Sequence, residues 1–164
     1  MLELFQKNTL NQYIQAGSNT NTNTNTNTNT NQTANANLSS DEQEVFNLIN
    51  QQRTSNGLSS LKIDSEVQNV ARIKAQDMVN NNYFSHTSPT YGSPFDMLKS
   101  YKVSYKTAGE NIAGNSSNSG AVTAWMNSSG HRANILNSSF TYTGIGVVSS
   151  PKYGKIYVQM FIGK

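Results

Sequence analysis

The sequence contains no cysteine among its 164 residues. This absence excludes disulfide bonds, thiolate metal sites and a cysteine nucleophile, although it does not by itself identify a compartment. Apolar residues are also scarce, because they make up 35% of the chain against a usual ~45–50% in globular domains. No stretch approaches the roughly 18 consecutive apolar residues of a membrane-spanning helix, so we expect no transmembrane segment.

Charge of either sign is sparse as well. The 12 Lys and Arg residues and the 9 Asp and Glu residues give a formal net charge of +3. The basic residues are scattered along the chain, and no run of them resembles a nucleic-acid-binding arm. We therefore expect no nucleic-acid partner. A mildly basic protein still favours anionic surfaces, such as a bacterial wall.

The shortage of apolar residues is concentrated in the first 39 residues. Residues 1–16 include several apolar side chains, but the early Glu3 and the missing apolar core are unlike a secretory signal. Asn and Thr then alternate over residues 19–31, and a tract with nothing apolar to bury cannot offset the entropy of ordering it. We predict a low-complexity tail or linker over residues 1–39. Residues 40–164 form the predicted domain, which is long enough to bury a core without staples.

The first half of this domain shows helical spacing of its apolar residues. Ser40 as an N-cap, with Gln43 as its capping-box partner, predicts a helix that ends near Gly57. Asp64 is the predicted N-cap of a second helix that runs to about Asn80. The buried stripe of this second helix is predicted to contain Val67, Val70, Ala71, Met78 and the aliphatic stem of Lys74.

The second half changes from a helical to a strand pattern. Ser93 followed by Pro94 predicts a short third helix, and residues 121–127 and 133–136 predict a helix and a single helical turn after a polar loop at 115–120. The apolar, β-branched segments 144–148 and 156–162 predict a β-hairpin. Helices first and strands last indicate an α+β fold. The prominent aromatic residues are interpreted as core rather than ligand-stacking side chains: Tyr83, Phe84, Tyr91, Phe95 and Trp125.

Three polar residues are the candidates for chemistry: His86, Glu110 and His131, each in a turn or small-residue segment. Two imidazoles and a carboxylate are a zinc ligand set that leaves one position open for water. Without a metal, the same residues suit general acid–base work. Their separations of 24 and 21 residues match no metal-binding motif. On the residues alone, each histidine is better interpreted as a turn or cap residue satisfied by backbone groups.

Three motifs occur in an order and spacing that resemble a known family: Tyr-Phe-Ser-His at 83–86, Gly-Glu-Asn-Ile at 109–112, and Trp-Met-Asn-Ser-Ser-Gly-His-Arg-Ala-Asn-Ile-Leu at 125–136. Together they resemble the CAP superfamily, also called SCP-like or allergen V5/pathogenesis-related-1 domains, in its bacterial branch. The resemblance covers residues 40–164 and extends to the strands at 144–147 and 157–161. It implies a three-layer α-β-α sandwich with a central antiparallel sheet.

The resemblance also implies one polar cleft with two histidines and up to two acidic residues, which in some members binds zinc or another divalent ion. His86 and His131 correspond to the histidines and Glu110 to one acid. Ser128 stands where many eukaryotic members have the second acid. The expected metal ligands are therefore His86, His131 and Glu110, with Zn²⁺ or another divalent cation weakly bound. The same three residues are the candidates for any catalytic role.

Family members have been linked to sterol or lipid binding, protease activity, protease inhibition and signalling, so the fold does not settle the activity. Bacterial members are often secreted or attached to walls or spores. We expect an extracellular, cell-surface or spore-associated monomer whose cleft holds an unknown ligand such as a lipid, peptide or wall component, and we favour binding over catalysis. Two alternatives stay open: a metal-assisted hydrolase of peptide or cell-wall material, and a structural or assembly protein of the wall or spore.

Overall fold

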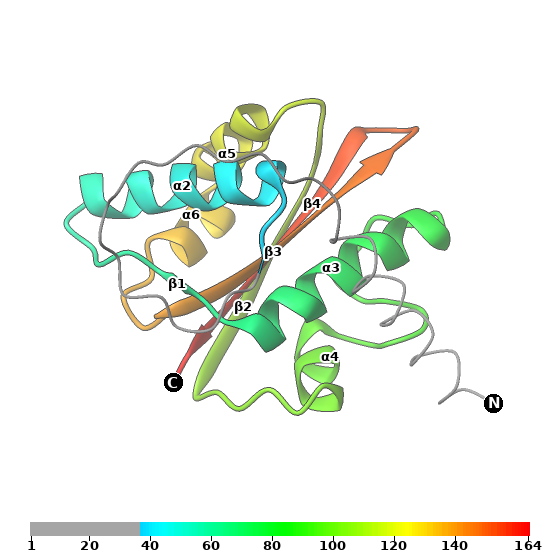
Figure 1. Ribbon diagram of the computed structural model, residues 1–164, viewed down its shortest axis with the longest axis horizontal. Coiled ribbons are helices and arrows are strands. Elements are labelled where there is room, and N and C mark those ends of the chain that lie inside the picture. The colour runs from blue at the N-terminus through cyan, green and yellow to red at the C-terminus, as the bar shows by residue number, and fades with distance from the viewer. Residues whose placement is uncertain (1–36) are drawn as a thin grey trace, which may run out of the picture. The chain divides into compact units, whose positions relative to one another are not determined.

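The computed structural model describes residues 37–164, and residues 38–164 form one compact unit. The predictions for residues 1–16 and for the Asn/Thr tract lie outside the described residues. Within the described part, five helices and a four-stranded sheet make an α+β fold (Figure 1). None of the helices in residues 37–164 is long and apolar enough to cross a membrane.

The predicted helix starts were confirmed where the capping side chain is unambiguous. Asp64 accepts hydrogen bonds from the backbone at the start of helix α3 (Ser65–Asn80). Ser93 caps helix α4 (Pro94–Ser100), which has proline in its first turn as predicted.

The cap of helix α2 (Ser40–Ser55) was predicted one residue too late. The capping box is made by Ser39 and Glu42, not by Ser40 and Gln43. The Glu42 carboxylate accepts from the Ser39 amide at 2.8 Å and also from the guanidinium of Arg72 at 2.8 Å. A neutral Gln43 side chain could not form the ion pair with Arg72 that Glu42 forms.

Helices α5 (Asn118–Asn127) and α6 (Ser129–Ile135) are longer than predicted. The predicted polar loop at 115–120 is wrong, because strand β2 continues to Asn115 and the α5 cap is Ser117. The Ser117 hydroxyl accepts from the Gly120 amide at 3.1 Å. The polar side chains of this segment thus start a helix rather than fill a loop.

The sheet contains β1 (Lys62–Ile63), β2 (Thr107–Asn115), β3 (Tyr142–Ser150) and β4 (Gly154–Gly163) in the order β1-β3-β4-β2. Strands β3 and β4 form the predicted hairpin, and β2 pairs antiparallel with β4. Strand β1 pairs parallel with β3, so the sheet is mixed and not purely antiparallel as expected.

The helices pack on both faces of this sheet (Figure 1). Alternate side chains of a strand point to opposite faces. The even-numbered β4 residues Ile156, Val158, Met160 and Ile162 pack in one core cluster with residues of α3 and α4. The odd-numbered Tyr157 and Phe161 pack in a second cluster with residues of α2, α5 and α6.

Helix α3 lies directly against strand β3. A Cβ atom at Gly144 would come within 2.3 Å of the Val67 carbonyl carbon, and one at Gly146 within 2.3 Å of the Ala71 oxygen. The buried Gln68 amide hydrogen-bonds the backbone of Ile145 in both directions, at 2.5 and 2.8 Å. The position of α3, which supplies part of the candidate site, is therefore fixed by backbone contact.

The interpretation of the aromatic residues as core was only partly right. Trp125 is buried with 1% exposure, whereas Phe84 and Phe95 are 41% and 49% exposed. Phe95 shares the short helix α4 with Met97 and Leu98, which take the buried positions. Phe84 lies against Tyr153 with ring centroids 5.3 Å apart. Exposure of both phenylalanines leaves apolar surface accessible to solvent.

Candidate functional site

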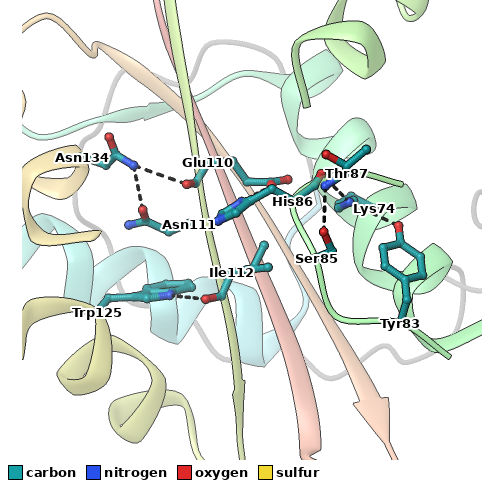
Figure 2. Close-up of polar contacts among 10 residues, drawn as sticks. All are labelled: Lys74, Tyr83, Ser85, His86, Thr87, Glu110, Asn111, Ile112, Trp125 and Asn134. Atoms are coloured by element: carbon teal, nitrogen blue, oxygen red, sulfur yellow. Dashed lines mark hydrogen bonds and ion pairs between the residues drawn. The ribbon is translucent and has the colours of Figure 1, made fainter. Parts of the chain in front are cut away.

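The candidate site lies on β2, which is an edge strand of the sheet. Glu110 and Asn111 are consecutive residues of this strand, so their side chains point to opposite faces. Glu110 faces the segment that carries His86, whereas Asn111 bonds to the backbone of His131. Figure 2 shows Glu110 and Asn111 on the strand, with His86 and Asn134 beside them. The edge of the sheet therefore divides the site into two halves.

In the first half, the Nδ1 atom of His86 lies 2.8 Å from Oε1 of Glu110. The Glu110 side chain is 1% exposed and that of His86 is 53% exposed. Burial raises the pKa of Glu110, and the hydrogen bond to His86 opposes this shift only in part. The hydrogen bond to Glu110 in turn raises the pKa of His86. A buried carboxylate thus orients a solvent-accessible imidazole, and Nε2 is the ring nitrogen left for a ligand.

The second carboxylate oxygen of Glu110, Oε2, is buried and has no hydrogen-bond partner among the described residues. Buried polar atoms are almost always satisfied in native proteins, and an unpaired one costs on the order of 1–3 kcal/mol. A water molecule, ion or ligand donor is therefore needed next to this oxygen.

Lys74 of α3 fixes the backbone of the His86 segment. Its side chain is fully buried, and Nζ donates to the carbonyl of His86 at 2.8 Å and to the hydroxyl of Tyr83 at 3.2 Å (Figure 2). Burial lowers the pKa of Lys74, while the carboxylates of Glu110 and Asp77 act in the opposite direction. The ring of His86 is thus held by Glu110 and its main chain by Lys74.

Asp77, one turn further along α3, anchors the same segment. The hydroxyl of Tyr83 donates to its carboxylate, and the hydroxyl of Ser88 donates to it at 2.7 Å. Two causes raise the pKa of Tyr83: burial is the larger one, and the hydrogen bond to Asp77 is the next. The sequence interpretation placed only the aliphatic stem of Lys74 in the core and missed this role. The available signal was two charged residues, Lys74 and Asp77, on the buried stripe of one helix.

The second half of the site is organised by the long C-terminal motif. The side-chain amide of Asn111 donates to the His131 carbonyl at 3.1 Å, and that of Asn134 donates to Asn111 Oδ1 at 2.9 Å. Trp125 donates from Nε1 to the Ile112 carbonyl at 3.0 Å. The His131 side chain belongs to α6 and is half-buried. Burial lowers its pKa, and the charge of His86 adds to that effect.

The geometry does not form a ready three-ligand metal site. Among residues 37–164, no group of three or more His, Asp or Glu side chains is placed to hold a metal ion. One Glu110 oxygen is bonded to His86 Nδ1, and the His131 imidazole forms no hydrogen bond or ion pair with either side chain among the described residues. It lies close enough to His86 for their charges to interact. Glu110 is instead placed like the outer-shell carboxylate that orients a metal-binding histidine. The set of His86, Glu110 and His131 as direct ligands stays a prediction.

Ser128, for which the family resemblance implies the position of a second acid, joins two helices. It is the C-cap residue of α5 and the N-cap residue of α6, without a side-chain capping hydrogen bond. Its half-buried hydroxyl brings no negative charge to the site.

Comparison with known proteins places these features in a family. The family model of CAP, the cysteine-rich secretory protein family, matches residues 46–161 of this sequence. The uncharacterized protein YkwD of Bacillus subtilis is 55% identical over 128 residues, which are 77% of this chain and 49% of that protein. The chain thus spans about half the length of this relative.

Solved structures agree with this assignment. A crystal structure of an extracellular protein containing a SCP domain from Bacillus anthracis matches with a TM-score of 0.70 and 44% identity, covering 76% of this chain and 40% of that one. An outer surface protein of Borrelia burgdorferi shares the fold, with a TM-score of 0.70 at 23% identity over 76% of this chain and 92% of that chain. The family predicted from the sequence motifs is confirmed: this chain belongs to the CAP family.

Proposed function

We propose that this chain is a bacterial CAP domain that acts outside the cell or at its surface and binds a ligand at His86, Glu110 and His131. The location is supported by the extracellular SCP-domain protein of Bacillus anthracis, which is 44% identical. The lack of cysteine is compatible with an oxidising environment, since no thiol needs protection.

The observation that carries the binding proposal is the unpartnered Oε2 atom of Glu110. A buried acceptor that no protein donor satisfies, next to an accessible imidazole, offers a position for a donor that a bound molecule brings. A ligand that donates a hydrogen bond to Glu110 and contacts Nε2 of His86 satisfies both groups. The ligand class is therefore polar at the point where it meets this pair, whatever the rest of it contains.

The same geometry favours binding over hydrolysis. Nucleophilic catalysis needs a hydroxyl within hydrogen-bonding reach of a base. Within the described residues, no hydroxyl group forms a hydrogen bond to either imidazole, and the nearby Ser85 hydroxyl accepts from the Thr87 amide at 3.2 Å. The metal-assisted alternative needs a set of ligands that residues 37–164 do not present in assembled form.

The proposal includes weak binding of Zn²⁺ or another divalent cation by the imidazoles of His86 and His131, with Glu110 orienting His86. Calorimetry with Zn²⁺ on wild type and on His131→Ala tests it. Weak, saturable binding that the substitution reduces supports the site. Equal affinity in the two proteins refutes it. If zinc-loaded protein turns over peptide or muropeptide libraries, hydrolysis replaces binding as the function.

A structural role is the second candidate, because the site residues also join secondary-structure elements. Asn111 and Asn134 tie β2 to α6 through side-chain and backbone hydrogen bonds. A purely structural site predicts that Ala at His86 or His131 lowers the melting temperature and leaves zinc binding unchanged. The binding proposal predicts a loss of zinc affinity in variants that remain folded.

A further inference from the structure

A pocket separate from the histidine site opens where the end of α2, strand β1, the segment before β3 and the C-terminal residue meet. Its volume is about 580 Å³, within the ~300–1,000 Å³ typical of small-molecule sites. None of its lining residues belongs to the His86, Glu110 and His131 site. Three of them are cationic, namely Arg53, Lys62 and Lys164, and none is acidic.

Arg53 is the buried cation of this pocket, with 2% exposure. Its guanidinium makes four hydrogen bonds, all to backbone carbonyls, at 2.7–3.2 Å. A guanidinium has five N–H donors, so one Nη2 hydrogen is left unused. These bonds hold the end of α2 against the end of α6 and the segment that leads to β3, and no carboxylate within residues 37–164 forms an ion pair with Arg53. Burial alone shifts the pKa of Arg53 downward, since no anion opposes it.

The other two cations differ in their partners. Lys164 forms an ion pair with Asp64 at 2.7 Å and lies over the ring of Tyr142. Lys62 is exposed and forms no ion pair or side-chain hydrogen bond within residues 37–164. Arg53 and Lys62 thus line one pocket, and neither has an ion-pair partner within residues 37–164.

Hydroxyl groups complete the wall of the pocket. Ser59, Ser60, Ser138 and Thr141 line it, and their hydroxyls make no hydrogen bond to other described residues. The pocket therefore combines excess positive charge with unused donors that approach from three separate segments. Oxyanions with several acceptor oxygens are the ligands that such a set of donors recognises.

We propose that this pocket binds the phosphate group of a small phosphate-bearing ligand, with Lys62 and Arg53 supplying charge and the hydroxyls supplying hydrogen bonds. Phosphate fits better than carboxylate because its three or four oxygens can use donors from several directions at once, whereas a planar carboxylate offers two. The pocket is larger than a phosphate ion, so the rest of its volume accommodates the group that the phosphate carries. This inference is independent of the function proposed for the histidine site.

Calorimetric titration with inorganic phosphate, dimethyl phosphate and acetate tests the proposal on wild type, Lys62→Gln, Ser138→Ala and the control Lys152→Gln. Lys152 is an exposed lysine in the β3–β4 turn, and its substitution removes the same charge at a distant position. We expect saturable phosphate binding that weakens about tenfold in Lys62→Gln, or about 1.4 kcal/mol, and is unchanged in Lys152→Gln. Ser138→Ala, which keeps the net charge, is expected to weaken it less.

The probes also identify the source of the phosphate group. Tighter binding of dimethyl phosphate indicates a phosphodiester, and tighter binding of inorganic phosphate indicates a free phosphate or a monoester; either supports the proposal. No saturable binding of either phosphate by wild type, equal losses in the two lysine variants, or a preference for acetate would overturn it.

Discussion

The substitution Lys74→Met tests how the His86 segment is held in place. Methionine fills much of the same space but cannot donate to the His86 carbonyl or the Tyr83 hydroxyl, which now lie 2.8 and 3.2 Å from Nζ. Hydrogen bonds from a charged group contribute about 1.5–3 kcal/mol each. Their loss is offset in part because the variant no longer buries an ammonium group, which costs several kcal/mol.

The two hydrogen bonds together contribute about 3–6 kcal/mol, and relief of the buried ammonium offsets several kcal/mol of this, so we expect a net destabilisation of up to about 3 kcal/mol. For a domain of this size, this corresponds to a fall in melting temperature of up to roughly 12 °C. Thermal unfolding followed by circular dichroism measures the global effect. Amide hydrogen exchange measures the local one, and the loss of protection should be largest in residues 83–88, which Lys74 and Asp77 anchor.

Lys99→Met in α4 is the matched control, because Lys99 is exposed and its loss should change the melting temperature by no more than a few degrees. A Lys74→Met protein with the wild-type melting temperature and unchanged exchange in residues 83–88 would refute the proposed role of Lys74. Uniform destabilisation without a local change would show that Lys74 is a core residue that does not position His86.

Three further predictions concern the site and the fold. Glu110 raises the pKa of His86 above 6.5, so this pair stabilises the folded state below pH 6.5, and the contribution is lost as pH rises through the folded pKa of His86. The difference in melting temperature between wild type and Glu110→Gln should therefore decline over this pH range. Melting curves that run parallel with pH would contradict this prediction. Ser128→Asp introduces a carboxylate at the position where the family resemblance implies a second acid, and calorimetry should show tighter Zn²⁺ binding than in wild type. Unchanged affinity would mean that this position does not reach the ion. Gly144→Ala should lower the melting temperature by several degrees because the new Cβ meets the α3 backbone. Gly130→Ala is the control and should not lower it, because the new Cβ has no neighbouring atom within 4 Å. Equal melting temperatures of the two variants would argue against direct contact between α3 and β3.

The predictions that succeeded rest on local physics. Asp64 and Ser93 bond to amides two or three residues away, so the sequence contains both partners of each cap within one turn. The hairpin of β3 and β4 was predictable for the same reason, because its strands are apolar and adjacent. The capping box of α2 is equally local, since Ser39 and Glu42 are three residues apart. Only the additional bond from Arg72 of α3 to Glu42 is a long-range contact that the sequence does not indicate.

Strand β2 shows why other features were missed. Its sequence, Thr-Ala-Gly-Glu-Asn-Ile-Ala-Gly-Asn, is poor in the β-branched and aromatic residues that indicate strands. It becomes a strand because β4 offers a complete antiparallel partner over nine residue pairs. Because the sequence pattern does not predict this strand, it also does not assign Glu110 and Asn111 to opposite faces of a sheet.

The site itself was predictable as a set of residues but not as a geometry. The motifs named His86, Glu110 and His131 through family resemblance, whereas periodicity alone favoured a structural role for each histidine. The direct bond between His86 and Glu110 joins residues 24 positions apart and depends on how the segment after α3 is anchored. The buried charges that anchor it, Lys74 and Asp77, are interpretable only once α3 is seen against β3, β4 and the His86 segment.

We propose that His86, oriented by Glu110, is a ligand-binding group. Anomalous diffraction from crystals soaked in Zn²⁺ at neutral pH tests it most directly. We expect a zinc peak at the Nε2 side of the His86 ring, with Glu110 still bonded to Nδ1. Well-ordered imidazoles with no zinc peak at either His86 or His131 would contradict it.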